Sequence, residues 1–367
     1  MKRILSIVLM IVLSISLLVA CTSEPDPVPE EPTTPDTGEE TQTTSGTITK
    51  LGLGHVISIA KSTDKGTDAN GNPVNPLAQA DVMIAAVGFD ADGKVVSVHI
   101  DTAQTRVAFD EDLQVTSDVN AEVPTKRDLG PNYGMGKISP IGKEWFEQMD
   151  ALQEWMVGKT VEEIVSMETT KRDDAHPTVP NVPELTSSVT IDVGDYLKIV
   201  EEAWNNAIDV TGAEKVGLGI KTSIAKSVSA GTDANGNPVS AKAQVDTIIN
   251  ATALDADGKV AGAIIDTAQV VIPFDEEGKV AIDKTAELRT KNELKEDYGM
   301  GKISPIGKEW YEQAQALAEW MKGKSLDEIK AMKLEEGRPA EEDLVSSVTI
   351  HVDDYLAVVE EAINNAK

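Results

Sequence analysis

One thirteen-residue block of the chain joins an aromatic side chain, a glycine-rich turn and two lysines. Tyr133 is followed by Gly134-Met135-Gly136-Lys137, and Ser139-Pro140 is typical of a helix start. Free backbone N–H groups at such a start favour an anion such as a phosphate or carboxylate, and the tyrosine offers a stacking face. The alternative is a glycine-rich turn before a helix that is buried through Trp145. The block recurs unchanged at Tyr298 to Trp310, so the candidate binding residues are Tyr133, Gly134, Gly136, Lys137, Tyr298, Gly299, Gly301 and Lys302.

A second candidate is a run of small hydroxyl residues that precedes the last predicted helix in each half of the chain. The first run spans Glu184 to Thr190, and the second spans Asp343 to Thr349. Hydroxyl groups at a helix entrance either cap the helix or hydrogen-bond a phosphate. The candidate residues in these runs are Ser187, Ser188, Thr190, Asp343, Ser346, Ser347 and Thr349.

The order of elements around these runs resembles the FMN-binding domain family, which occurs in extracytoplasmic flavoproteins and bacterial electron-transfer lipoproteins. The family pattern is D-G-x-[ST]-G-A-T, and a flavin transferase attaches FMN to its last Thr as a phosphoester. Matching residues are Asp343, Ser346 and Thr349 in the second run and Ser187 and Thr190 in the first, where Glu184 replaces the Asp. The departures are Leu185 and Leu344 for the first Gly, Ser188 and Ser347 for the second, and Val189 and Val348 for the Ala. Glycine permits close approach of another molecule to the backbone, so bulkier residues at these positions obstruct a transferase or the flavin itself. Two alternatives follow: FMN is attached covalently to the threonine, or it binds without a covalent bond.

The four histidines form no catalytic or metal-binding group that both halves share. Three have a different residue at the equivalent position, and the fourth lies in a loop found only in the first half: His55 (Ile220), His99 (Ile264), His351 (Asp192) and His176. We therefore expect these histidines on the surface or on edge strands, with no metal site and no catalytic residue. The sequence contains no HExxH or Walker loop, which leaves enzyme activity open but favours a binding or electron-transfer protein over a hydrolase or transferase.

The elements that must position these residues are duplicated at an offset of 165 residues. Gly66 to Val74 recurs unchanged at Gly231 to Val239, and Asp90 to Val95 recurs at Asp255 to Val260. Alternating apolar residues and turn signals such as Asp92-Gly93 predict strands over 55–61, 78–89, 94–100, 107–109, 113–116 and 188–191. Helices are predicted over 140–157 and 193–207, with a capping box at 160–163. We expect an α+β fold of two tandem repeats, 47–210 and 211–367, each a mainly antiparallel sheet with helices packed on one side and each folding independently.

The amino terminus predicts a bacterial lipoprotein. Lys2 and Arg3 precede an uncharged apolar run over 4–20, which is typical of a signal peptide, and Leu18-Val19-Ala20-Cys21 resembles a lipobox. The alternative is a plain transmembrane anchor with an incidental cysteine. Residues 1–21 are thus the expected signal, with Cys21 as the lipidation site, and 22–46, rich in Pro, Thr and acids, form an expected disordered linker. We expect an extracytoplasmic protein anchored to the cell membrane through Cys21.

Charge and cysteine content exclude several classes of function. Among 367 residues, 33 are Lys or Arg and 62 are Asp or Glu, a net charge of −29 that repels nucleic acid. One cysteine excludes an internal disulfide and any cysteine-based zinc or iron–sulfur cluster. The expected function is membrane-anchored FMN binding, in extracellular electron transfer, with a flavin transferase or a membrane redox protein as partner. The alternative is a non-redox surface lipoprotein that binds an anionic small molecule or a protein.

Overall fold

A computed structural model describes residues 47–367. The predicted signal peptide, Cys21 and the linker lie outside the described residues. Among residues 47–367, no helix is both long enough and apolar enough to cross a bilayer.

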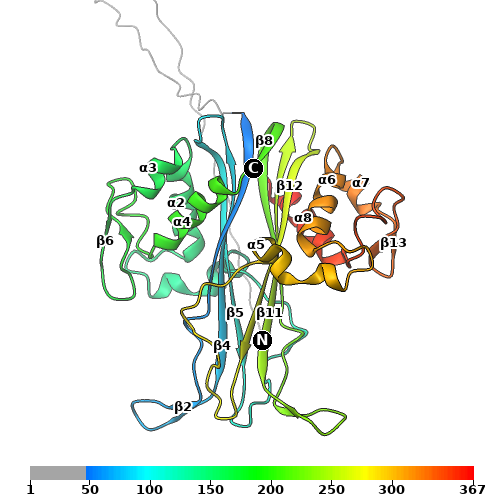
Figure 1. The fold of residues 1–367 in the computed structure, drawn as a ribbon. Coiled ribbons are helices and arrows are strands. Elements are labelled where there is room, and N and C mark those ends of the chain that lie inside the picture. The colour runs from blue at the N-terminus through cyan, green and yellow to red at the C-terminus, as the bar shows by residue number, and fades with distance from the viewer. Residues whose placement is uncertain (1–46) are drawn as a thin grey trace, which may run out of the picture. The chain divides into compact units, whose positions relative to one another are not determined.

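Six long strands form one antiparallel sheet, to which residues 48–207 (the first half) and 208–367 (the second half) contribute three strands each (Figure 1). The strand order is β12-β11-β8-β1-β4-β5. The bounds are β1 Ile48–Ser58, β4 Leu77–Phe89, β5 Val95–Ala108, β8 Ile208–Ser223, β11 Lys242–Asp255 and β12 Val260–Pro273. The halves are joined by a short pairing of β1 with β8, in which Leu51 lies opposite Ile208. The boundary expected at residue 210 falls inside β8.

Helices cover the strands of each half from outside. Figure 1 shows α2, α3 and α4 on one side of the strands and α6, α7 and α8 on the other. The bounds are α1 Lys126–Leu129, α2 Trp145–Met156, α3 Val161–Val165, α4 Gly194–Asn205, α5 Lys291–Leu294, α6 Trp310–Met321, α7 Leu326–Lys330 and α8 Asp353–Asn365. The fold is therefore mixed α and β, with a large antiparallel sheet.

Apolar side chains form three clusters, and one of them belongs to both halves. The shared cluster packs apolar residues of one half against those of the other. It includes Phe109 and Phe274, which directly follow β5 and β12 and whose rings meet edge to face with centroids 4.9 Å apart. The other two clusters lie under the helices, around Trp145 in the first half and Trp310 in the second. The shared cluster buries apolar area that either half alone would expose to water.

Two glycines in each half let a helix lie directly on a strand. A Cβ at Gly54 of β1 would lie 1.9 Å from the carbonyl oxygen of Ile199 in α4. A Cβ at Gly219 of β8 would likewise lie 1.9 Å from the carbonyl oxygen of Val358 in α8. The Gly-Leu-Gly segment that recurs in both halves is therefore required by helix packing.

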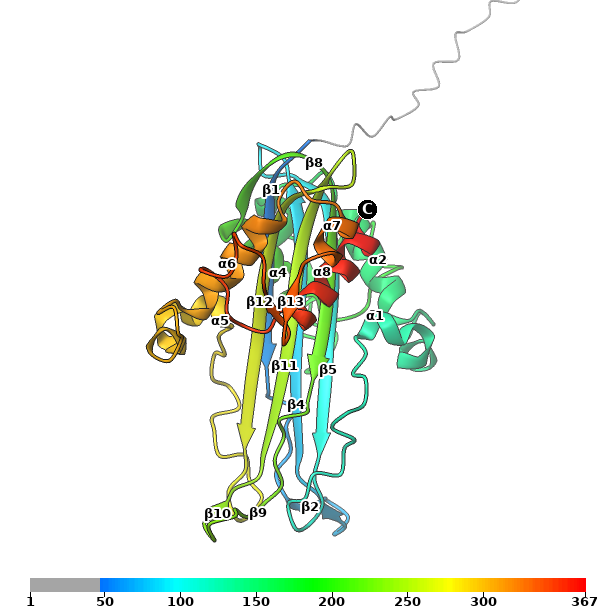
Figure 2. The same ribbon diagram turned by 90° about the vertical axis from the view of Figure 1, so that its right-hand side faces the viewer.

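Four short two-stranded ribbons complete the fold: β2 Gly66–Thr67 with β3 Pro73–Val74, β6 Thr169–Thr170 with β7 Val179–Pro180, β9 Gly231–Thr232 with β10 Pro238–Val239, and β13 Leu334–Glu335 with β14 Arg338–Pro339. The repeated Gly-Thr-Asp-Ala-Asn-Gly segments form the β2–β3 and β9–β10 ribbons. Figure 2 shows both at the end of the sheet far from the C-terminus. They therefore lie away from the helices that carry the candidate residues.

Local turn and cap signals predicted several elements correctly. The Asp92-Gly93 turn between β4 and β5 is confirmed: Gly93 has φ 77°, and Asp90 Oδ1 accepts from the N–H groups of Asp92 and Lys94. The Thr160 cap of α3 is also confirmed, because Thr160 Oγ1 accepts from the N–H of Glu163. The helix predicted over 193–207 is α4.

Five predicted elements differ from the structure. The strand placed at 107–109 is the end of β5, and the strand placed at 113–116 is absent, since only Val115 pairs there, in an isolated bridge with Phe109. The strand placed at 55–61 is β1, which runs from Ile48 to Ser58. The helix predicted to begin at Ser139-Pro140 begins at Trp145, because Gly142 has a left-handed φ of 67° that a helix cannot continue through. Residues 188–191 form turns and irregular chain instead of a strand.

Candidate functional site

The Gly-Met-Gly-Lys loop does not lead straight into a helix. It folds into two short 3-10 turns, η1 Gly130–Tyr133 and η2 Met135–Lys137, separated by Gly134 with φ 78°. The N–H groups of Gly134, Ile138 and Ser139 bond to carbonyl groups within the loop. The second half repeats this arrangement as η3 Lys295–Tyr298 and η4 Met300–Lys302. Lys137 and Lys302 are exposed, so positive charge there faces solvent.

A half-buried lysine lies over the tyrosine of each block. Lys126 Nζ is 5.2 Å from the ring centre of Tyr133 and 5.4 Å from that of Trp145, within cation–π range. Burial lowers the pKa of Lys126 to about 8. In the second half Lys291 Nζ is 4.9 Å from the Tyr298 ring and 5.1 Å from the Trp310 ring. Neither lysine was singled out from the sequence, although the Thr-Lys pair repeats at the offset of 165.

A buried glutamine ties the hydroxyl run to the Gly-Met-Gly-Lys block. Gln148 Oε1 accepts from the N–H and the hydroxyl of Thr190, at 2.8 and 3.3 Å, while Gln148 Nε2 donates to Ser139 Oγ at 3.2 Å. In the second half Gln313 makes the same contacts with Thr349, at 2.9 and 3.3 Å, and with Ser304 at 3.4 Å. The two segments singled out by the sequence thus lie side by side in both halves.

An arginine lies beside the threonine of each run. Arg172 donates to the Thr190 carbonyl at 2.7 Å, and Arg338 donates to the Thr349 carbonyl at 3.0 Å. Both guanidinium groups are partly exposed, and neither was singled out from the sequence. They come from ribbons whose lengths differ between the halves, so the repeat offset does not align them.

The remaining candidate residues take local roles. Ser188 and Ser347 donate back to the carbonyl groups of Leu185 and Leu344, at 3.3 and 3.1 Å. Asp343 is exposed and accepts from Trp320 Nε1 at 3.2 Å. Exposed positions in the same runs are Glu184, Ser187 and Ser346.

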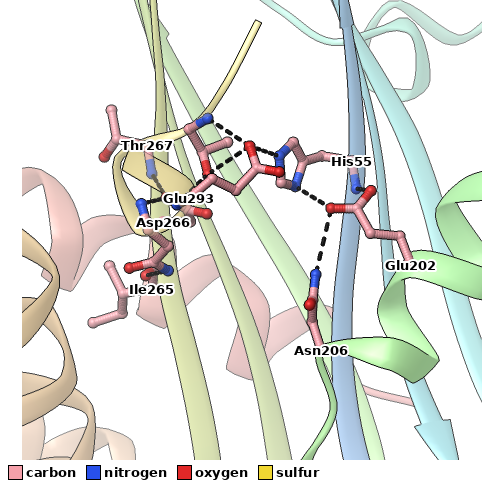
Figure 3. A network of polar contacts seen from close by, with 9 residues as sticks. His55, Glu202, Asn206, Ile265, Asp266, Thr267 and Glu293 are labelled. Carbon is pink, nitrogen blue, oxygen red and sulfur yellow. Dashed lines mark hydrogen bonds and ion pairs between the residues drawn. The ribbon is translucent and has the colours of Figure 1, made fainter. Parts of the chain in front are cut away.

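A further polar cluster centres on His55. The prediction that this histidine lies on the surface or on an edge strand was wrong. His55 lies on the interior strand β1 and is only 7 % exposed. Its Nε2 lies 3.0 Å from Glu293 Oε2, and its Nδ1 lies 3.3 Å from Glu202 Oε1 (Figure 3). Glu202 comes from α4 and Glu293 from α5, so one imidazole lies between carboxylates of the two halves. His99, on the edge strand β5, agrees with its expectation.

The imidazole and the carboxyl groups of this cluster shift one another's pKa values. Burial lowers the pKa of His55, but the Glu293 hydrogen bond and the charges of Glu202 and Asp266 outweigh burial and hold that pKa above its usual value. Burial raises the pKa of Glu202 and of Asp266. Asp266 is held by the N–H groups of Thr267 and Asn292, at 2.7 and 3.1 Å. Within residues 47–367, His55, Glu202 and Glu293 place one nitrogen and two oxygens within 4.8 Å of one another.

The second half builds the same cluster without the imidazole. Glu361 Oε2 accepts from the N–H of Ile220 at 3.0 Å, just as Glu202 Oε2 accepts from the N–H of His55 at 2.9 Å. Burial, with the charges of Asp128 and Asp101, raises the pKa of Glu361 to about 7. A cavity of about 530 Å³ borders His55, and one of about 270 Å³ borders Ile220. Neither cavity is lined by the Tyr133 or Thr190 segments or their counterparts.

Comparison with known proteins finds limited similarity. No protein-family profile matches the chain, and no solved structure matches it. A chlorophenol reductase from Desulfitobacterium hafniense is 31 % identical over 94 residues, which are 23 % of this chain and 29 % of that protein. The chain therefore spans less than a third of the length of this relative.

Proposed function

We propose that this chain is a lipid-anchored protein on the outer face of a bacterial membrane that binds FMN and passes electrons. In this proposal each half is one copy of the same α+β domain and holds one flavin. The observation that supports it best is that Gln148 joins Thr190 to the Gly-Met-Gly-Lys block while Arg172 donates to the Thr190 carbonyl, and that Gln313, Thr349 and Arg338 repeat this arrangement. The partial relative is a reductase, which agrees with a role in redox chemistry.

The residues around Thr190 and Thr349 fit the phosphate of FMN better than they fit a covalent bond to it. Arg172 and Arg338 offer guanidinium groups, which bind phosphate through paired N–H donors. The hydroxyl groups of both threonines already donate to a glutamine, and that bond must break before the oxygen can form a phosphoester. Leu185 and Leu344, where the family pattern has glycine, are 2 % exposed and pack in the core, so the backbone there is not open to a ligand.

The side chains of the chain would then bind and tune the cofactor, while the flavin supplies the electron transfer. Arg172 and Lys137 would hold the phosphate of the first half, with Arg338 and Lys302 doing so in the second. Lys126 keeps a positive charge beside Tyr133, which would favour an anionic reduced flavin nearby.

Titration of the purified full-length protein with FMN, followed by quenching of flavin fluorescence, tests the proposal. We expect up to two equivalents bound. Arg172→Met should weaken one of them about tenfold or more, since a charge-assisted hydrogen bond contributes about 1.5–3 kcal/mol. Lys171→Met is the matched control, because it removes the same charge from a neighbouring exposed side chain that pairs with Asp174 instead.

Intact mass after co-expression with a flavin transferase tests covalent attachment. A gain of one FMN less one water that disappears in Thr349→Val would place the phosphoester in the second half, where Asp343 also matches the family pattern. No FMN binding below the millimolar range and no mass gain would refute the proposal. The alternative, a non-redox lipoprotein that binds an anionic ligand or a protein, would then better explain the positions of Arg172 and Arg338.

A further inference from the structure

The imidazole of His55 carries a buried nitrogen that lacks a hydrogen bond. Nδ1 is fully enclosed and has no aligned donor or acceptor among the described residues, although Glu202 Oε1 lies only 3.3 Å away. Buried polar atoms without a hydrogen bond are rare in folded proteins, and each one calls for a partner. Nδ1 and Oε1 therefore offer one nitrogen and one oxygen that a single further group can bind together.

The other groups hold this pair in place. Nε2 of His55 bonds to Glu293 Oε2 at 3.0 Å, which fixes the orientation of the ring. Glu202 Oε2 accepts from the N–H of His55 at 2.9 Å, which turns Oε1 toward Nδ1 (Figure 3). Histidines that bind metal ions commonly make this outer contact, with the second ring nitrogen bonded to a carboxylate.

We propose that His55 Nδ1 and Glu202 Oε1 bind one divalent transition-metal ion of the zinc class. With metal–ligand bonds of about 2.0–2.1 Å, a separation of 3.3 Å between nitrogen and oxygen corresponds to an angle of about 105°, close to the tetrahedral value that zinc prefers. Glu293 acts as the positioning carboxylate. The metal replaces the proton on Nδ1, which leaves to solvent, and water from the adjoining cavity completes the coordination.

Asn206 lies at the same oxygen and can join the site. Its side-chain nitrogen is 3.5 Å from the Glu202 carboxylate, and Asn206 lines the cavity of about 530 Å³ together with His55. Rotation of the amide would present its oxygen to the metal.

The counterpart site around Ile220 is a natural control, because it keeps two carboxylates, one from each half, and lacks the imidazole. Ile220 stands at the position of His55, Glu361 at that of Glu202, and Asp128 at that of Glu293. Glu361 is held by the N–H of Ile220 at 3.0 Å, so its backbone contact matches that of Glu202. The proposal therefore predicts one site in the chain, in the first half, and a second one on restoring the histidine.

Zn²⁺ titration of the purified full-length protein, read by calorimetry and by competition with a chromophoric chelator, tests the site. We expect one equivalent that binds more tightly than the background of surface carboxylates. His55→Ile, which copies the second half, should lose that equivalent. Glu293→Gln should weaken it about 10–100-fold. Ile220→His should add a second equivalent.

Circular dichroism and thermal melting establish that each variant is folded. A folded His55→Ile protein that binds as many tight equivalents as wild type overturns the proposal. If His55→Ile does not fold, Glu202→Gln decides the question by the same criterion. Ile220→His without any additional equivalent contradicts the assignment of the imidazole and one carboxylate as the ligands.

Discussion

Replacing Gly54 by Ala tests the closest contact between a helix and the sheet. The new Cβ would lie 1.9 Å from the carbonyl oxygen of Ile199 and 2.8 Å from the nitrogen of Ala203. Non-bonded heavy atoms settle about 3.5 Å apart, so β1 and α4 must separate by about 1.5 Å. Both neighbours are backbone atoms of a helix, and no side-chain rotation can relieve the overlap.

The expected loss of stability follows from what α4 buries. Tyr196, Leu197, Ile199, Val200 and Ala203 all face the core from this helix. A gap of 0.5–1 Å already forfeits about a quarter to a half of the dispersion energy across an interface. Overpacking costs about 1–3 kcal/mol and sometimes more, so a rigid helix displaced by about 1.5 Å should cost about 3–4 kcal/mol.

Urea unfolding of the purified protein, followed by circular dichroism, measures this loss. For a slope of about 3 kcal/mol/M, the midpoint should fall by about 1 M. Gly66→Ala is the matched control: Gly66 is exposed, has nothing within 4 Å of an added Cβ, and should change stability by less than about 0.5 kcal/mol. If Gly54→Ala unfolds at the same urea concentration as Gly66→Ala, the direct packing of α4 on β1 is wrong.

Three further predictions concern pH, the joined halves and the anchor. The pKa of Glu361, about 7 against an ordinary 4.5, means that the folded state holds an extra proton, so stability should fall as pH rises from about 4.5 to 7. Glu361→Gln should flatten this pH dependence and stabilise the protein by about 1–2 kcal/mol at pH 8, after allowance for solvent screening. Urea unfolding at pH 5 and at pH 8 measures this, and a variant that loses as much stability between the two pH values as wild type would contradict the prediction. A fragment of residues 47–207 should show no cooperative melting by circular dichroism, because it loses the core around Phe109 and Phe274; a sharp transition from a monomer would refute the shared core. Cys21→Ala should leave an uncleaved precursor or release protein into the medium, and fatty-acid labelling with normal processing of this variant would rule out the lipobox.

The sequence alone determined the features that depend on neighbouring residues. The Asp92-Gly93 turn needs one positive φ and one aspartate side chain, and the Thr160 cap needs a glutamate three residues on, so both are visible in a short window. The helix start at Ser139-Pro140 was mispredicted from an equally local signal. Gly142 takes a left-handed φ of 67°, which moves the start of α2 to Trp145.

The candidate site was predictable only in part. The repeated block at Tyr133 and the run ending at Thr190 were recognised separately, since each is a continuous stretch of sequence. Their contact through Gln148 was not, because Gln148 and Thr190 are 42 residues apart and no periodicity relates a helix face to a distant turn.

Only the tertiary structure decided how the two halves meet. Taken separately, each half reads as a domain with its own sheet, and the sequence therefore predicted independent folding. The pairing of β1 with β8 and the shared apolar cluster depend on surface complementarity between segments far apart in the chain. His55 shows the same limit: Glu202 is 147 residues away and Glu293 is 238 residues away. The imidazole of His55 lies between two carboxylates because the folded sheet brings Glu202 of the first half and Glu293 of the second half beside β1.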